Sequence, residues 1–324
     1  MFDLLRRSLL VLCGTVLFTP AAFSQDAATD KPLRIVSPFP PGGANDIIAR
    51  LIAHKLAANG SRTVLVENRP GAAGGIGTAS VATSPPDGNT LVLGTLATHG
   101  INPSIYKSLQ YDVVRDFAPI ALVASIPIVL VVNPSLPATD VRQLIEMAKQ
   151  RPGQVNFASS GIGSVNHLAG ELFASTAGVR MVNIPYKGSS PALTDLLGGQ
   201  VSVMFDLLPS SLPHIQSGKL RALAVTSSQR SALLPNLPTM AESGLPGYQV
   251  NSWFGILAPA KTPKATVTKL NSEVGKVLQS PGIREQMSEQ GAEPLFSSPE
   301  EFGKVINADL ATWAQVVMTL GLRQ

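Results

Sequence analysis

The sequence predicts an α/β protein of two lobes with a cleft between them. Apolar strand patterns alternate with helical patterns, first over residues 33–93 and again over residues 141–225. Continuous apolar strands between helices are typical of a parallel sheet that helices cover on both faces. The last 60 or so residues carry only helical patterns, and we expect them to return to the first unit. Two crossings between the units would form a hinge.

The composition describes a well-buried globular chain. Of the 324 residues, 44% are hydrophobic and 14% are charged, which argues against disorder. The length allows two domains. The formal net charge is +4, but the lysines and arginines are scattered. Nucleic-acid binding needs a basic stripe or an aromatic platform, so the composition argues against that class of partner.

Residues 1–24 have the pattern of a removable export signal. Two arginines precede the apolar run Leu9–Phe18, and small residues around Ser24 resemble a cleavage site. We expect cleavage after Ser24 and an exported mature protein. The only cysteine, Cys13, lies inside this signal, so the mature chain would have no thiol for disulfides or metal ligands.

The first unit is predicted from three strand patterns and the helices between them. Leu33–Val36, Thr63–Val66 and Thr90–Leu93 are short apolar runs, and Ile47–Ala57 carries apolar residues at helical spacing. A glycine-rich turn over residues 70–77 begins a second helical stretch. This order predicts one sheet with helices between its strands.

The second unit follows the entirely apolar strand Ile126–Val132. Beyond it the predicted helices and strands alternate through residues 141–149, 154–158, 165–175, 181–184, 191–197, 201–205, 212–216 and 220–225. Glycines near helix C-termini and prolines near N-termini fit the usual capping preferences.

The chain then returns to the first unit. Tyr248–Leu257 is predicted to be extended, and its Trp253 and Phe254 are interpreted as hinge or core packing, with cleft lining as the alternative. The remainder is helical in three pieces, broken at 281–282 and 298–299. We therefore expect residues 30–130 plus 250–324 to form the first lobe and residues 131–249 the second.

The loop between the first strand and the first helix is a candidate binding site. Prolines end the strand there, and Gly42 and Gly43 let another molecule approach the backbone closely. The helix N-terminus that follows suits a carboxylate or phosphate. The alternative is an ordinary strand-to-helix turn, with Asp46 as the N-cap.

Two further loops follow strands and carry hydroxyl side chains. One contains Thr95 and Thr98; the other contains Gly161, Gly163 and Ser164, with Ser164 at the expected N-cap position. The carboxyl ends of parallel strands face the ligand crevice of an α/β sheet. Such loops can hold an anion with neutral groups alone, although ordinary turn chemistry remains the alternative for each.

Other classes of site are disfavoured. Asn166 stands where a dinucleotide fingerprint needs its third glycine, and no phosphate-binding loop motif occurs. The four histidines are scattered without a metal motif, so we expect no metal and no cofactor. Ser104–Lys107 matches one β-lactamase motif without its partners, and no nucleophile elbow exists, so we expect no enzyme. Asp206, after an apolar strand, either accepts a proton from a ligand or caps a turn.

Motifs along the whole chain resemble one family. They include Pro38–Gly43 with Asp46 and Arg50, Val66–Ala72, Pro86–Gly88, Asp116–Ile120, Pro185–Gly188, Leu197–Gln200 and Trp253 with Gly255. Together they look like the receptors of tripartite tricarboxylate transporters, the Bug-type (TctC-like) periplasmic solute-binding proteins. The resemblance covers essentially all of residues 33–320.

The resemblance implies a type II periplasmic binding protein fold, with two α/β lobes joined by hinge strands and a ligand in the cleft. It implies a small organic dicarboxylate or tricarboxylate, or a related anion, as ligand. By the same resemblance, the residues that clamp the carboxylate are Phe39, Gly42, Gly43, Ala44, Asn45, Thr95, Thr98, Ser159, Gly163 and Ser164. Asp206 would face the distal part of the ligand. Asn45 and residues 95–98 depart from the usual family pattern, which leaves the ligand's identity open.

The implied protein is a monomeric periplasmic receptor that serves membrane permease subunits. The alternative is a ligand sensor that feeds a kinase of a two-component system, and the sequence does not separate the two. An exported enzyme is a third class, but no catalytic constellation supports it.

Overall fold

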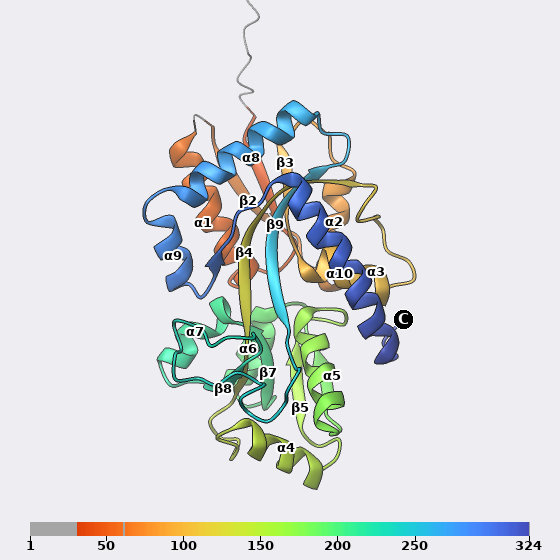
Figure 1. Ribbon diagram of the computed structural model, residues 1–324, viewed down its shortest axis with the longest axis vertical. Helices are drawn as coiled ribbons and strands as arrows, with labels where there is room; N and C mark the ends of the chain where they lie inside the picture. Colours follow the sequence, from red (N-terminus) through yellow and green to blue (C-terminus); the bar gives the residue numbers. More distant parts are fainter. Residues whose placement is uncertain (1–30, 61, 324) are drawn as a thin grey trace, which may run out of the picture. The chain divides into compact units, whose positions relative to one another are not determined.

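The computed structural model describes residues 31–60 and 62–323, which belong to one compact unit, Lys31–Gln324 (Figure 1). The export signal expected at residues 1–24 lies outside the described residues. Among the described helices, none combines the length and the apolar character that crossing a membrane requires. The predicted α/β fold with two lobes is confirmed.

Three parallel strands form the centre of the first lobe. Strand β1 (Leu33–Ser37) pairs with β2 (Val64–Asn68) on one side and with β3 (Thr90–Thr95) on the other. The other elements of this lobe are α1 (Ala44–Asn59), η1 (Ala72–Gly74), α2 (Gly75–Ala82), η2 (Ala97–Ile101), α3 (Asn102–Ile105), α8 (Lys264–Gln279), α9 (Ile283–Glu289), β10 (Glu293–Pro294) and α10 (Pro299–Thr319).

Helices cover both faces of this sheet, as the sequence predicts. On one face, α1, α8 and α9 share a core with the strands, and on the other α2, α3 and α10 do so (Figure 1). The C-terminal helices therefore return to the first lobe. Their breaks lie near the predicted positions, between α8 and α9 and before α10.

The second lobe has the same central arrangement. Strand β5 (Asn156–Ser159) pairs in parallel with β6 (Val182–Pro185) and with β7 (Val203–Leu207). The lobe is completed by α4 (Val141–Gln150), α5 (Val165–Ala177), α6 (Ser189–Leu197), α7 (Leu208–Gln216) and β8 (Arg221–Val225).

Two long strands run between the lobes. Strand β4 (Phe117–Val132) pairs antiparallel with β9 (Asn251–Pro259) through Pro127, and its last five residues pair antiparallel with β7. The predicted parallel pairing is right for β1, β2 and β3 and for β5, β6 and β7. It is wrong for β8, which pairs antiparallel with β4. A strand buried on both faces reads as an apolar run whichever way it points.

Each lobe therefore repeats one topology: β2-β1-β3 is completed by antiparallel β9, and β6-β5-β7 by antiparallel β4. No repeat is visible in the sequence. The repeat makes α1 and α5 equivalent, since each follows the central strand of its lobe. The lobe boundaries near residues 130 and 250 stay a prediction.

Candidate functional site

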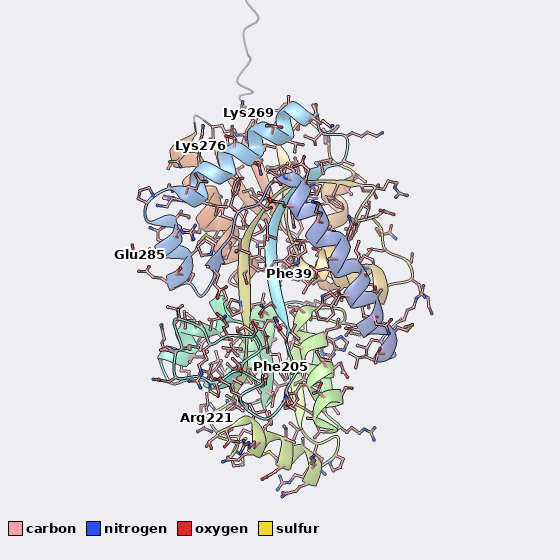
Figure 2. All side chains as sticks on the ribbon, in the orientation of Figure 1. Phe39, Phe205, Arg221, Lys269, Lys276 and Glu285 are labelled. Atoms are coloured by element: carbon pink, nitrogen blue, oxygen red, sulfur yellow. The ribbon has the colours of Figure 1, made fainter. Side chains whose placement is uncertain are left out.

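A cavity lies between the lobes at the N-terminal ends of α1 and α5. The volume of the cavity is about 30 Å³. Phe39, which Figure 2 labels near the junction of the two lobes, contributes to its wall. The lining residues are Phe39, Pro40, Gly43, Ala44, Asn45, Thr95, Ala97, Ser160, Ser164, Val165, Asn166, Ser189, Leu207, Ser252 and Phe254.

The first-lobe wall includes a loop that Asp46 holds in place. Gly43 is the N-cap of α1, so the N-cap role predicted for Asp46 is wrong, and Asp46 lies in the first turn. Its carboxylate accepts hydrogen bonds from the Gly42 N–H at 2.9 Å, from Arg50 and from Asn68. Burial raises the pKa of Asp46, but these hydrogen bonds outweigh burial and lower it overall. Gly42 has φ +80°, which favours glycine at this turn.

Asn45 ties the start of α1 to two strands of the first lobe. Its Oδ1 accepts a hydrogen bond from Ser37 Oγ at 2.7 Å, and its Nδ2 donates to the Leu93 carbonyl at 3.1 Å. Ser37 ends β1, and Leu93 lies in β3. The N-terminus of α1 is therefore fixed relative to the sheet.

Asn166 ties the start of α5 to the sheet of the second lobe. Its Oδ1 accepts from Ser160 Oγ at 2.6 Å, and its Nδ2 donates to the carbonyl of Phe205 in β7 at 2.6 Å. Ser164 is the N-cap of α5, as predicted, and its side chain accepts from the His167 N–H. The predicted cap is confirmed, and the loop before it is held by a second hydrogen bond, from the Gly163 N–H to His167 Nδ1.

The two helix N-termini converge on the cavity. The first N–H groups of a helix have no partner within it, and they carry partial positive charge. The residues that carry these groups, Ala44 and Asn45 in α1 and Val165 and Asn166 in α5, all line the cavity. Both helices are long enough, at 16 and 13 residues, to develop a dipole. The site is therefore suited to an anion.

The lining residues are all neutral. They include hydroxyl and amide side chains but no lysine, arginine, histidine or carboxylate. Among the described residues, no group of three or more histidine, cysteine or carboxylate side chains could hold a metal ion. An anion here would be held by N–H groups and hydroxyls, without a buried counter-charge.

Asp206 lies behind the cavity wall. Its side chain is fully buried and accepts hydrogen bonds from Ser189, Ser210, Ser211 and Asn166. Burial raises the pKa of this carboxyl, although the serine hydrogen bonds oppose the shift. Asp206 does not line this cavity, and its carboxylate reaches it through Ser189 and Asn166. Its expected place facing the ligand stays a prediction.

The structure divides the other predicted residues into two groups. Those that line the cavity are Phe39, Gly43, Ala44, Asn45, Thr95 and Ser164. Thr98 and Ser159 are fully buried beside it, and Thr98 Oγ1 accepts from the Thr95 N–H at 3.0 Å. Gly42 and Gly163 have positive φ and shape the two loops. A direct role in ligand binding stays a prediction for every one of these residues.

The sequence reasoning missed several polar lining residues: Ser160, Asn166, Ser189 and Ser252. In the structure Asn166 lies two positions after the N-cap Ser164, as Asn45 lies two positions after the N-cap Gly43. The sequence did not show this equivalence, because Asp46 was the N-cap considered for the first helix. Phe254 lines the cavity, as the alternative to hinge or core packing predicted. No local pattern marks Ser189 or Ser252.

Comparisons with known proteins agree with this architecture. A family model described as "Tripartite tricarboxylate transporter family receptor" matches residues 48–322. The structure of Rpa4515 from R. palustris with adipate is similar, with a TM-score of 0.89 and 40% identity over 91% of this chain and 99% of that chain.

Two further solved structures are similar. The periplasmic binding protein BugD gives a TM-score of 0.87 and 37% identity, over 91% of this chain and 99% of its own. MatC (Rpa3494) from Rhodopseudomonas palustris with bound malate gives a TM-score of 0.85 and 32% identity, over 89% of this chain and 99% of its own. The chain therefore belongs to the tripartite tricarboxylate transporter receptor family, the Bug-type (TctC-like) solute-binding proteins.

Proposed function

We propose that this protein is a periplasmic receptor that captures a small organic carboxylate and delivers it to the permease subunits of a tripartite tricarboxylate-type transporter. The observation that carries the proposal is the pair of helix N-termini, from opposite lobes, that line one neutral cavity. A carboxylate between them would accept hydrogen bonds from both lobes.

The known relatives support the carboxylate. One similar structure contains adipate and another contains malate, and both ligands are dicarboxylates. The export signal predicted at residues 1–24 and the similarity to the periplasmic BugD support the location. The family description supports the permease partner.

Binding is coupled to closure of the lobes. A ligand that contacts both helix N-termini interacts more strongly with the closed arrangement than with an open one, and it therefore shifts the population toward closure. Ordered water can bridge a carboxylate to the more distant hydroxyls at little cost in affinity.

A thermal-shift screen tests the proposal. The purified mature chain, residues 25–324, is heated with mono-, di- and tricarboxylic acids and with the matching amides, for example succinate and succinamide. A bound acid raises the melting temperature by mass action, whereas its amide does not. A screen in which no acid raises the melting temperature contradicts the proposal.

A pair of N-cap variants separates binding from stability. Ser164→Ala and Ser298→Ala each remove a serine N-cap, from α5 at the cavity and from α10 away from it. Each should lower the free energy of unfolding by about 1 kcal/mol. Only Ser164→Ala should also weaken acid binding, by about fivefold, because the loss of a polar contact of this kind is worth about 1 kcal/mol. Titration calorimetry measures the affinities, and equal affinities in the two variants would contradict the site.

A further inference from the structure

Two hydroxyls on the second-lobe wall have their protons directed away from the cavity. Ser160 Oγ donates to Asn166 Oδ1 at 2.6 Å, and Ser189 Oγ donates to Asp206 Oδ1. Both serines line the cavity. A hydroxyl has one proton and two lone pairs. A serine that donates its proton away from the cavity therefore presents only a hydrogen-bond acceptor to a ligand.

The hydrogen bonds around Asp206 fix the direction of the Ser189 proton. Oδ1 of Asp206 also receives the Nδ2 group of Asn166 at 3.2 Å, while Oδ2 receives Ser210 and Ser211. An ionised carboxylate has no proton to donate, so with Asp206 ionised the hydrogen bond between it and Ser189 carries the serine proton.

The cavity thus has two unlike sides. The helix N-termini offer N–H donors that suit a carboxylate, whereas Ser189 offers an oxygen lone pair backed by a fully buried carboxyl group. A second ligand oxygen without a hydrogen would meet that lone pair unfavourably. A hydroxyl or an ammonium group would meet it favourably.

We propose that Ser189, oriented by Asp206, is a specificity-determining residue that selects carboxylic acids with a hydrogen-bond donor, a hydroxyl or an ammonium group, near the bound carboxylate. The inference rests on the carboxylate-binding function proposed above. It assigns Asp206 a positioning role that needs no contact with the ligand.

Titration calorimetry on the mature chain with matched acids tests this assignment. The sets are succinate, malate and aspartate, and propionate, lactate and alanine, in which members of a set differ in the donor at one carbon. In at least one set the hydroxy or amino acid should bind about tenfold or more tightly than the unsubstituted acid, since sites built around a polar ligand group reject analogues that lack it. Comparison of the two substituted acids separates hydroxyl from ammonium.

Variants at residues 189 and 190 place the effect on one side chain. Ser189→Ala should remove the preference for donor-bearing acids, because their hydrogen bond to the Ser189 hydroxyl is lost. It should leave the affinity for unsubstituted acids within about twofold, since those acids have no donor for Ser189. Ser189→Thr, which keeps the hydroxyl, should retain the preference. The matched control is Ser190→Ala: Ser190 donates to the Pro41 carbonyl and does not line the cavity, so its loss should change all affinities by the same factor.

The outcomes are distinguishable. Equal affinities for substituted and unsubstituted acids in the unaltered protein overturn the assignment and leave carboxylate binding intact, with a water as the partner of Ser189. A preference that survives Ser189→Ala also overturns it. Binding of none of the acids overturns the proposed function itself, and this inference with it.

Discussion

His99 is fully buried in the first lobe, where its ring packs edge-on against Phe117 and its Nδ1 lies 2.8 Å from Thr98 Oγ1. Its Nε2 has no hydrogen-bond partner among the described residues. Burial lowers its pKa to about 3. Burial also lowers the pKa of His167, to about 4. Both side chains are therefore neutral in the folded protein at neutral pH.

These histidines make the folded protein sensitive to acid. In the unfolded chain they titrate near pH 6.5, so between that pH and the folded pKa the unfolded state binds more protons and stability falls as the pH falls. Each histidine should contribute a slope of about 1.4 kcal/mol per pH unit over that range. Urea unfolding at several pH values between 4 and 7.5 measures the slope.

His99→Gln should remove one histidine's share of this slope, whatever it does to stability at pH 7.5. The control is His54→Gln, since His54 is exposed on the surface of α1. Identical slopes in His99→Gln and the unaltered protein would falsify this explanation of acid sensitivity.

Strand β9 and helix α10 are packed so closely that one glycine is needed between them. A Cβ on Gly255 would lie 2.1 Å from Cζ of Phe302, whereas a Cβ on Gly303, the next residue of α10, would meet nothing closer than 3.9 Å. Phe302 also packs edge-on against Trp253 of β9. The absence of a side chain at Gly255 thus allows the aromatic contact.

Alanine at these two glycines should have opposite effects. Gly255→Ala overpacks the contact and should lower the free energy of unfolding by about 1–3 kcal/mol. Gly303→Ala lies inside a helix with room for a methyl group and should raise that free energy by about 0.5–1 kcal/mol. Urea unfolding of both variants gives the comparison. Equal and small changes in the free energy of unfolding would mean that β9 and α10 accommodate a methyl group at Gly255 without loss of stability.

At the level of elements, the sequence predicts what depends on local signals. The serine before a helical pattern identified the N-cap of α5, and the proline and glycine breaks separated α8, α9 and α10. The start of β4 was missed, because Pro119 interrupts the apolar run beside a register shift in the strand pair. The orientation of Asp206 was also inaccessible, since its serine partners come from two separate helices, α6 and α7.

In the described unit, direct hydrogen bonds join the two lobes. Tyr106 of the first lobe donates to the Ile162 carbonyl of the second, and Ser190 of the second lobe donates to the Pro41 carbonyl of the first at 2.8 Å. These contacts stabilise this arrangement of the lobes independently of a ligand.

Tyr106→Phe should shift the ligand-free protein toward an open arrangement, by about fivefold if the hydrogen bond contributes about 1 kcal/mol. Small-angle X-ray scattering should show a larger radius of gyration, and a bound acid should dissociate correspondingly faster. The matched control is Tyr111→Phe, because Tyr111 donates to the Thr98 carbonyl within the first lobe. Indistinguishable scattering and dissociation rates for the two variants would rule out a closure role for Tyr106.

The place of β9 in the first sheet also governs the order in which the protein can fold. Strand β3 gains its second neighbour from β9, and the pairing of Val92 with Leu257 spans about half of the chain. A chain that emerges N-terminus first therefore leaves the edge of β3 unpaired until its last quarter has arrived. Long-range pairing of this kind is slow to form. The sheet of the first lobe is therefore completed only when β9, more than 150 residues after β3, is available to pair.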